Sequence, residues 1–316
     1  MKTLLITRRL PDAVLQAAGA HFIVTLRDET APLSPAELRA ALQNYDAILP
    51  TLGDLFRAEV FADVPKPRAQ ILANFGVGYN HIDVDAARAA GIAVTNTPGA
   101  VTDATADVAM TLILMAARRA GEGERLVRGG RWQGWFPTQM LGTPVTGRRV
   151  GVIGMGRIGQ AIARRCHFGF GMEVVFHSRS VVSNPGCPAR QVDMAQAMAA
   201  DFVVVAVPGG PATRHLINRE TLAQMRPHGI FVNISRGDVV DETALVAALR
   251  LGQIAAAGLD VYEFEPKIPA DLLALENVVL LPHLGTAVLE VRSAMGLMAV
   301  ANLVAHLDGA PLPNPV

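Results

Sequence analysis

Short apolar segments rich in Val and Ile alternate with Ala-rich helical patterns along the whole chain, and this alternation constrains the fold most. Continuous apolar runs are typical of strands that are buried on both faces, as in parallel sheets covered by helices. The sequence therefore predicts an α/β architecture. We expect strands at 4–7, 22–26, 47–49, 71–75, 92–96, 150–154, 173–178, 202–207, 230–235, 257–261 and 278–282, and helices at 35–42, 103–120, 159–166 and 241–250.

Length and charge limit the class of protein. The chain has 316 residues, which is about two domains. It carries 28 basic and 28 acidic residues, so no global charge favours a polyanion, and we expect no nucleic-acid partner. The most apolar helical run starts at Val108 and ends at Arg118, which is too short to span a bilayer, so we expect no membrane partner.

The remaining segments indicate organisation and compartment. The turn-rich stretch 96–107 is the best candidate for a domain boundary, and 129–144 has no periodicity but carries both tryptophans. Cys166 and Cys187 form neither a disulfide framework nor a metal cluster, so we expect no metal. The N-terminus lacks the long apolar core of a signal peptide, and the expected compartment is the cytoplasm.

A G-x-G-x-x-G motif at Gly154, Gly156 and Gly159 lies between a predicted strand and a predicted helix. In that context the first glycine allows a tight turn and the second lets the backbone approach a pyrophosphate. The third lets the helix pack closely on the strand, and the helix N-terminus attracts the phosphates. The alternative is a purely structural glycine turn, but the surrounding strands favour a dinucleotide site.

The residue at the end of the next strand indicates whether the site binds NAD(H) or NADP(H). An NAD site places Asp or Glu about 20 residues after the motif, where it binds the ribose 2′-hydroxyl. This chain has Ser178 there, followed by Arg179. A carboxylate would repel a 2′-phosphate, whereas Ser and Arg can hydrogen-bond it. We therefore predict NADP(H) in preference to NAD(H); the alternative is that Arg179 is a solvated surface charge.

Three further blocks follow strand-like runs and contain Arg236, Asp260 with Glu265, and His283. The carboxyl ends of parallel strands lie at one edge of a sheet, where open α/β sheets bind ligands. Separately, these residues have ordinary structural interpretations, as a salt bridge, a surface charge and a packed loop histidine. Together, an Arg, a carboxylate and a His at the cofactor edge indicate acid/base chemistry.

Five ordered motifs resemble those of the D-isomer-specific 2-hydroxyacid dehydrogenase family, and the resemblance covers nearly the whole chain. They are N-x-G-x-G-x-x-x-I-D at 74–83, the glycine motif, N-x-x-R-G-x-x-V-D-E at 233–242, G-L-D-V-x-x-x-E-P at 258–266 and P-H-x-G-T at 282–286. An ordered set is far more specific than any one motif. Within the family, segments 97–119 and 131–137 are similar to the NADPH-dependent glyoxylate/hydroxypyruvate reductases.

The resemblance implies roles for individual residues. Arg236, Glu265 and His283 match the catalytic Arg, Glu and His of the family. Asp260 would face the nicotinamide amide, or alternatively cap a strand end. The substrate would be bound by Arg236 and by backbone N–H groups of the loop Phe75, Gly76, Val77 and Gly78. With the glycine motif, Ser178 and Arg179, the expected cofactor-binding residues are Thr105, Arg157, Ile158, Val207, Pro208, Thr213, Ile234, Ser235, Asp260 and Gly285.

The resemblance also implies the domain organisation. A Rossmann-type cofactor domain, residues 99–284, would be inserted into a flavodoxin-like substrate domain formed by residues 1–98 and 285–316. The active site would lie between the domains, and closure would exclude water. A homodimer would form mainly through the cofactor domains. Trp135 would reach into the partner subunit's active site, or alternatively serve only to pack the dimer interface.

A reductase mechanism follows for a 2-oxo acid. Hydride transfer to the carbonyl carbon requires a proton for the carbonyl oxygen, and His283 can supply it because histidine titrates near neutral pH. Glu265 would orient the ring, and Arg236 would hold the carboxylate and polarise the carbonyl. We expect NADPH-dependent reduction of glyoxylate or hydroxypyruvate to glycolate or D-glycerate.

Other functions remain open at this point. Segment 49–56 resembles the group that reduces hydroxyphenylpyruvate, so an aromatic 2-oxo acid is one alternative. A dinucleotide-sensing binding protein of the same fold is another, because such relatives can retain the Arg–Glu–His set. Formate and phosphite dehydrogenases share the architecture, but Ser178, Arg179 and the absence of a Lys at the Val77 position speak against phosphite.

Overall fold

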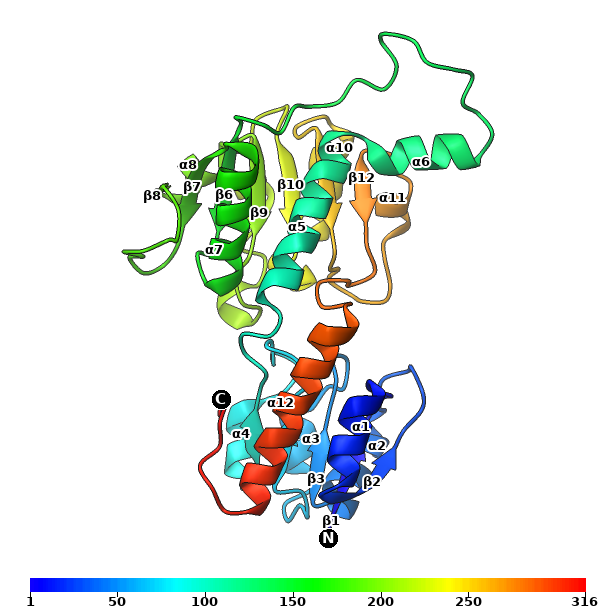
Figure 1. Ribbon diagram of the computed structural model, residues 1–316, viewed down its shortest axis with the longest axis vertical. Coiled ribbons are helices and arrows are strands. Elements are labelled where there is room, and N and C mark those ends of the chain that lie inside the picture. The colour runs from blue at the N-terminus through cyan, green and yellow to red at the C-terminus, as the bar shows by residue number, and fades with distance from the viewer. The chain divides into compact units, whose positions relative to one another are not determined.

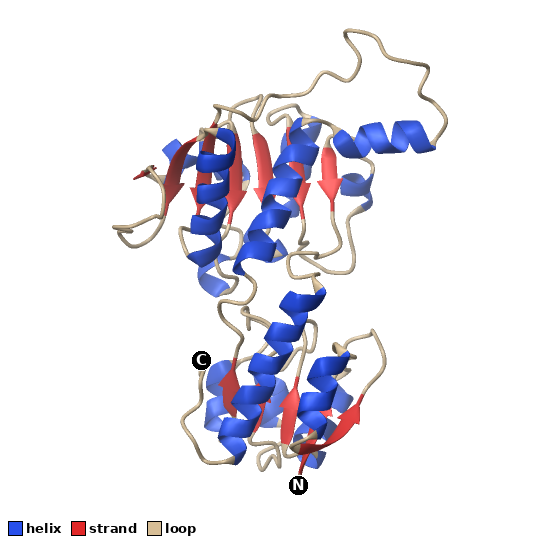
Figure 2. Ribbon diagram, viewed as in Figure 1, coloured by secondary structure: helices blue, strands red, loops and turns tan.

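The computed structural model describes all residues, 1–316, and divides into two compact units. Unit 1 combines Met1–Val101 with Ala287–Val316, and unit 2 is the continuous stretch Thr102–Thr286. Each unit contains one sheet, drawn in red in Figure 2, and every strand pair in both sheets is parallel. The predicted α/β class with parallel sheets is therefore confirmed.

Unit 1 has a five-stranded sheet in the order β2-β1-β3-β4-β5, which is the flavodoxin-type order. Its strands are β1 (Lys2–Ile6), β2 (Phe22–Leu26), β3 (Ala47–Leu49), β4 (Ile71–Ala73) and β5 (Ala93–Thr95). Its helices are α1 (Asp12–Gly19), α2 (Pro35–Asn44), α3 (Ala58–Ala62), α4 (Val84–Ala89) and α12 (Leu289–Leu307).

Helices cover both faces of this sheet, which explains the continuous apolar runs. Within β1, Leu5 packs in the cluster of α2, α3 and α4, whereas its neighbours Leu4 and Ile6 pack in the cluster of α1 and α12. Successive residues of a strand point to opposite faces, so a strand covered on both sides must be apolar at every position. The buried end of β1 accordingly shows the continuous apolar run that was expected from the sequence.

Unit 2 has a seven-stranded sheet in the order β12-β11-β10-β9-β6-β7-β8, which contains the Rossmann-type order. Its strands are β6 (Arg149–Ile153), β7 (Glu173–His177), β8 (Ala189–Gln191), β9 (Phe202–Val205), β10 (Ile230–Asn233), β11 (Ala256–Leu259) and β12 (Val278–Leu280). Its α-helices are α5 (Thr102–Ala117), α6 (Ala120–Arg128), α7 (Arg157–Arg164), α8 (Met194–Met198), α9 (Arg219–Leu222), α10 (Glu242–Arg250) and α11 (Ala270–Leu273). A π-helical turn, η1 (Arg165–Gly169), and two 3₁₀ turns, η2 (Pro211–Thr213) and η3 (Gly237–Val239), complete it.

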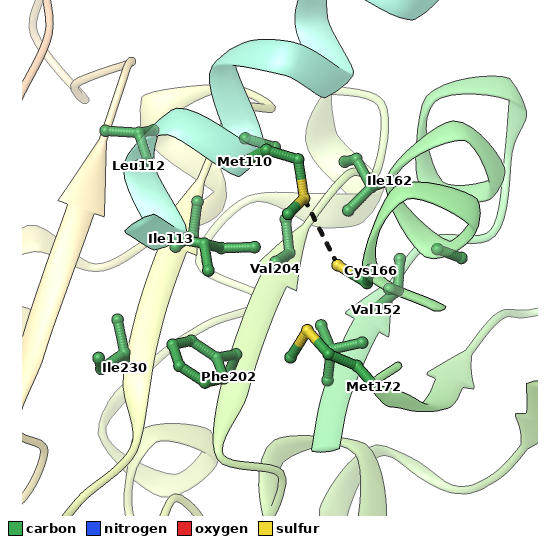
Figure 3. Packing of buried hydrophobic residues seen from close by; sticks show 14 of the residues in the cluster. Met110, Leu112, Ile113, Val152, Ile162, Cys166, Met172, Phe202, Val204 and Ile230 are labelled. Carbon is green, nitrogen blue, oxygen red and sulfur yellow. Dashed lines mark hydrogen bonds between the residues drawn. The ribbon is translucent and has the colours of Figure 1, made fainter. Parts of the chain in front are cut away.

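The core of unit 2 lies on both faces of its sheet. Helices α5 and α7 cover the face that is nearer in Figure 1, and α8, α9 and α10 pack in the cluster on the other face. Figure 3 shows the first cluster, in which Phe202 and Ile230 of the sheet face Met110 and Ile113 of α5. Cys166 is fully buried there, with its sulfur 3.6 Å from the sulfur of Met110, and so packs as a core residue.

Local sequence determines where the capped helices begin. Helix α2 starts after Ser34, whose hydroxyl accepts the Glu37 N–H while the Glu37 carboxylate accepts the Ser34 N–H. Helix α10 starts after Asp241, which accepts the Ala244 N–H at 3.0 Å. Both are side-chain caps that satisfy N–H groups lacking a partner within the helix.

Some expected boundaries were wrong. Most strands end one or two residues earlier than their apolar runs, because the chain leaves the sheet while it is still buried. The helix expected at 103–120 stops at Ala117, and α6 starts separately after Arg119, whose φ of 53° breaks the helical path. Strand β8 was not expected, since it is a short, largely exposed edge strand with no apolar pattern.

Candidate active site

The carboxyl ends of three neighbouring strands bring the expected catalytic residues to one edge of the sheet in unit 2. Arg236 follows β10, Glu265 lies in the loop after β11, and His283 follows β12. These strands are adjacent in the sheet and parallel, so the residues that follow them lie close together. The sheet order, which the sequence did not specify, thus gathers the three side chains.

His283 and Glu265 form a hydrogen-bonded pair. Nδ1 of His283 lies 2.9 Å from Oε2 of Glu265, and both side chains retain 29% exposure. The other carboxylate oxygen accepts the Tyr262 N–H at 3.0 Å, which orients the carboxylate. Because Nδ1 is held by the carboxylate, Nε2 is the ring nitrogen that can exchange a proton with a ligand.

The backbone at His283 has an uncommon conformation. Its φ is 54°, in the left-handed region that few residues with a Cβ adopt. Its N–H donates to the Asp260 carbonyl at 3.0 Å, which ties the turn to the end of β11. Such residues concentrate at sites where the surrounding structure imposes a side-chain direction.

The site combines an anion, a fixed cation and an imidazole. Burial raises the pKa of Glu265, but the hydrogen bond with His283, the Tyr262 N–H and the charge of Arg236 outweigh it, so this pKa lies below its ordinary value. Burial lowers the pKa of Arg236, yet a guanidinium stays protonated at neutral pH. At neutral pH the carboxylate of Glu265 is therefore ionised beside a permanent positive charge.

The loop that carries Glu265 is braced by residues that the sequence did not single out. Gly237, next to Arg236, packs so closely on this loop that a Cβ there would lie 1.8 Å from the carbonyl carbon of Tyr262. Glu242, which is buried, accepts the Glu263 N–H at 2.8 Å. Burial raises the pKa of Glu242. The only sequence signal for Glu242 was its place in the V-D-E block, and this motif does not reveal its partner Glu263, which lies 21 residues away.

Tyr262 connects the two strand ends that carry the pair. Its N–H binds Glu265, and its hydroxyl donates to the Leu281 carbonyl at 2.9 Å, just before His283. The side chain is 6% exposed, and burial raises the pKa of its hydroxyl. A buried tyrosine hydroxyl requires an acceptor, but the sequence does not say which one.

The glycine motif has the geometry that a dinucleotide needs. Gly154 has a φ of 99°, and a Cβ on Gly159 would lie 2.0 Å from the Gly154 carbonyl oxygen, so both positions exclude a side chain. A Cβ on Gly156 would stand in open space at the start of α7, where a pyrophosphate could approach the backbone. The residues present therefore fit a dinucleotide.

The residues expected to select the cofactor follow β7 and open α7. Ser178 is half-buried, and its carbonyl accepts the Gln191 side chain at 3.2 Å. Arg179 and Arg157 are exposed and form no ion pair, whereas Ile158 is partly buried against the core. Two unpaired guanidinium groups in unit 2 are thus available to an anionic ligand.

The other expected cofactor residues form a hydrogen-bonded rim along the same edge. Thr105 donates to the Gly285 carbonyl at 3.1 Å, and Thr213 donates to the Pro208 carbonyl at 2.7 Å. Ser235 donates to the Val207 carbonyl, and Ile234 beside it is buried. The rim thereby connects α5 and the loops after β9, β10 and β12.

Asp260 takes the capping role that was the structural alternative for it. Its two carboxylate oxygens accept the N–H groups of Leu284 at 2.6 Å and Gly285 at 2.8 Å. Burial is the largest influence on Asp260 and raises its pKa above the ordinary value. A contact with the nicotinamide stays a prediction.

The remaining expected site residues belong to other segments of the chain. Phe75, Gly76, Val77 and Gly78 form a half-buried loop after β4, at the carboxyl edge of the sheet in unit 1. Trp135 lies in the long loop after α6 and is 79% exposed. No helix in the structure is long and apolar enough to cross a bilayer.

Known proteins resemble this chain over its full length. Residues 110–285 match the family model described as D-isomer specific 2-hydroxyacid dehydrogenase, NAD binding domain. A glyoxylate reductase from Thermococcus onnurineus is 42% identical, with 98% of this chain and 94% of that protein covered. A glyoxylate/hydroxypyruvate reductase B from Serratia proteamaculans is 39% identical, with 99% of this chain and 96% of that protein covered.

Solved structures agree with these relatives. An NADPH-dependent glyoxylate/hydroxypyruvate reductase from Sinorhizobium meliloti, solved with NADP and malonate, has a TM-score of 0.88 at 36% identity and covers 100% of this chain and 96% of its own. A Thermus thermophilus protein has a TM-score of 0.91 at 40% identity, with 99% of both chains covered. By its motifs, its fold and these matches, this chain belongs to the D-isomer specific 2-hydroxyacid dehydrogenase family.

Proposed function

We propose that this protein reduces a small 2-oxo acid, glyoxylate or hydroxypyruvate, to the D-2-hydroxy acid with NADPH. The observation that carries the proposal is the His283–Glu265 pair at 2.9 Å, beside Arg236 at the cofactor edge of the sheet. Carbonyl reduction needs a proton donor and a positive charge at the developing oxyanion, and this set contains both. The names of the Thermococcus and Serratia relatives support the choice of substrate.

The three side chains would have different roles in this reaction. When bound, the dinucleotide supplies the hydride that adds to the carbonyl carbon. His283 donates the proton on Nε2 to the carbonyl oxygen, because Glu265 holds Nδ1 and fixes the ring. Arg236 binds the carboxylate of the substrate and stabilises the negative charge that develops on the carbonyl oxygen. In the oxidative direction, His283 accepts the proton of the hydroxyl.

Preference for NADPH is supported by the residues after β7. Ser178 stands where an NAD site has a carboxylate, and Arg179 follows it, exposed and without an ion pair. A guanidinium and a hydroxyl can hydrogen-bond a 2′-phosphate. Because residue 178 is a serine, no carboxylate stands at this position to repel the phosphate. The Sinorhizobium relative, solved with NADP, is named as NADPH-dependent.

The two units would have different tasks. We assign dinucleotide binding to unit 2, which contains the glycine motif, and substrate carboxylate binding to the Phe75–Gly78 loop of unit 1. A backbone loop rich in glycine can bring several N–H groups to one anion.

A homodimer is supported by exposed apolar side chains in unit 2. The loop after α6 exposes Trp132, Trp135, Phe136 and Leu141, with exposed fractions of 53%, 79%, 52% and 67%. Near Leu141, a cavity of about 330 Å³ opens beside Met115 and Val279. A second copy would cover these surfaces, and Trp135 would then contribute to the site of the partner subunit.

An aromatic 2-oxo acid is the second candidate substrate. Leu52 and Leu55, 39% and 47% exposed, lie in the segment after β3. The Phe75 N–H donates to Pro50 in that segment, so the two leucines belong to the same edge of unit 1 as the substrate loop. Exposed apolar side chains there would suit a larger, apolar substrate side chain.

One spectrophotometric experiment tests these proposals. The purified protein is assayed with NADPH and with NADH against glyoxylate, hydroxypyruvate, pyruvate and 4-hydroxyphenylpyruvate. We expect the highest kcat/KM with NADPH and glyoxylate or hydroxypyruvate. A higher value for 4-hydroxyphenylpyruvate would support the aromatic substrate. A protein that binds NADPH but reduces none of these acids would instead be a dinucleotide sensor.

A further inference from the structure

The loop after β4 turns its carbonyl groups toward two asparagine side chains. Nδ2 of Asn74 donates to the carbonyls of Gly76 and Gly78, both at 3.0 Å. Nδ2 of Asn96, from the chain after β5, donates to the carbonyl of Val77 at 2.9 Å. Three consecutive carbonyls of the loop are thus held from within unit 1.

The orientation of these carbonyls determines the orientation of the N–H groups. The peptide bonds of the loop are trans, so in each planar unit the N–H points opposite to the C=O. Holding the carbonyls of Gly76, Val77 and Gly78 therefore directs the N–H groups of Val77, Gly78 and Tyr79 the other way. None of these three N–H groups donates to another group of the chain.

We propose that Asn74 and Asn96 are positioning residues that set the peptide planes of this loop so that its N–H groups bind the carboxylate of the substrate. The inference rests on the proposed reduction of a 2-oxo acid. Neighbouring N–H groups that point to one side form a concave anion site without a charged side chain. The asparagines would touch the loop and not the substrate.

The burial of Asn74 supports a fixed geometry. Its side chain is 0% exposed, and both of its bonds are to carbonyls of the loop. The Gly78 carbonyl has no other donor in the chain, so without Asn74 the loop would have to move for this carbonyl to find another partner. Oδ1 of Asn74 has no hydrogen-bond partner, so the amide is held through its N–H₂ group alone.

Gly76 adds a backbone reason for the same geometry. Its φ of 156° lies in a region that residues with a Cβ rarely adopt. Its carbonyl accepts a second bond, from the Thr97 N–H at 3.1 Å. The first carbonyl of the set is therefore held from both β4 and the chain after β5.

The test is steady-state kinetics of Asn74→Ala and Asn96→Ala with glyoxylate and NADPH. We expect KM for glyoxylate to rise about tenfold in each variant, while kcat and KM for NADPH change less than about threefold. The inhibition constant of malonate, an unreactive carboxylate, should rise by the same factor. The isosteric variants Asn74→Asp and Asn96→Asp keep the side-chain volume but lose the donor, so they should show at least the same rise.

Asp46→Asn is the matched control for general destabilisation. Asp46 lies at the opposite end of the same sheet, where it accepts the Thr3 N–H at 2.7 Å. This variant should lower Tm and leave KM for glyoxylate unchanged. If Asn74→Ala does not fold, Asn96→Ala and the two Asp variants decide the question.

Two results would overturn the positioning role while leaving the proposed function intact. One is an active wild type with unchanged KM in all folded Asn variants. The other is an equal rise of KM in Asp46→Asn, which would mean that loss of stability alone weakens substrate binding. A wild type that reduces no 2-oxo acid would overturn the proposed function itself, and this inference with it.

Discussion

His283 is oriented from one side of its ring. Glu265 holds Nδ1, and the left-handed backbone at His283 directs the ring, so Nε2 is the atom that can reach a ligand. Arg236 is close enough to Glu265 to lower its pKa. At the scale of single residues, the tasks proposed for the pair and for the arginine can be distinguished by substitution.

The variant His283→Ala should lose catalysis and keep cofactor binding. Removing the proton donor is expected to lower kcat by about 10²- to 10⁴-fold, because general acid catalysis contributes that much. The Kd for NADPH, measured by fluorescence, should change little, since the glycine motif lies in other loops. Turnover close to that of the wild type would remove His283 from the mechanism.

The variant Arg179→Ala should weaken the preference for NADPH. Loss of a charge-assisted hydrogen bond to the 2′-phosphate should lower kcat/KM with NADPH by about 10- to 100-fold, and the value with NADH should be nearly unchanged. Arg190→Ala is the matched control, because Arg190 is also exposed and lies on the neighbouring strand β8. Equal losses in the two variants would contradict a specific contact.

At the scale of secondary structure, the same hydrogen bond occurs at the amino end of both sheets, from the N–H of a strand residue to an aspartate carboxylate. In unit 1 the Asp46 carboxylate accepts the Thr3 N–H at 2.7 Å, and in unit 2 the Asp201 carboxylate accepts the Arg149 N–H at 2.9 Å. Each aspartate precedes a strand that pairs with the one it caps. In each unit, a charged side chain at the amino ends of the strands thus connects two strands that are distant in sequence.

Acid should remove the contribution of Asp46. Hydrogen bonds from Arg68 outweigh burial and, with those from Thr3, hold its pKa well below its ordinary value. Because the folded-state pKa is depressed, the stabilisation is present above the unfolded value near 3.8 and is lost as pH falls through the folded pKa. At pH 7, Asp46→Asn should lower Tm by about 3–6 °C.

Thermal unfolding between pH 2 and pH 7 measures this effect. The difference in Tm between wild type and Asp46→Asn should shrink below about pH 4. Asp63→Asn is the control, because Asp63 forms an exposed pair with Arg39 and should change Tm little at any pH. A difference that is independent of pH would contradict the role of the charge.

Tyr262 joins two elements, so its hydroxyl should affect both stability and turnover. Tyr262→Phe leaves the Leu281 carbonyl without this donor and should lower the free energy of unfolding by about 1 kcal/mol. A modest fall in kcat, with unchanged KM for NADPH, is expected because Leu281 precedes His283. Tyr45→Phe is the control, since the Tyr45 hydroxyl donates to no group of the chain. Identical effects of both variants would argue against the connection.

At the scale of the whole molecule, two sheets of different order are built from one chain. Unit 2 is continuous, and unit 1 is completed only by the segment after Ala287. Helix α12 packs on α1 so closely that a Cβ on Gly296 would lie 2.4 Å from Val14. The last helix is therefore required for the core of the first unit.

Assembly belongs to the same scale, and Trp135→Ala tests it. If the ring narrows the partner's site, the ratio of kcat/KM for 4-hydroxyphenylpyruvate to that for glyoxylate should rise about tenfold. Trp132→Ala, in the same exposed loop, is the matched control and should leave the ratio unchanged. Light scattering should give a dimer for both variants. If Trp135→Ala leaves this ratio of kcat/KM values unchanged, Trp135 only packs in the dimer interface and does not narrow the substrate site.

Much of this protein was determined by the sequence alone, because burial and capping are local properties. Continuous apolar runs located every strand except β8, and the helices expected from residues 35 and 241 begin within one residue of those positions. The glycine motif indicated its own turn, since a Cβ on Gly159 would collide with Gly154 and Val152 of the same strand–helix unit. Periodicity and short motifs predict structure that depends on residues close together in the sequence.

Only the tertiary structure decided which distant groups meet. The order β12-β11-β10 brings Arg236, Glu265 and His283 to one edge, and no local pattern encodes that order. The bond from Asn96 to Val77 and the bond from Tyr262 to Leu281 were not predicted from the sequence, and the cap formed by Asp260 was only one of two alternatives there. Each joins segments that follow different strands, so it exists only once the sheet has placed those strands side by side.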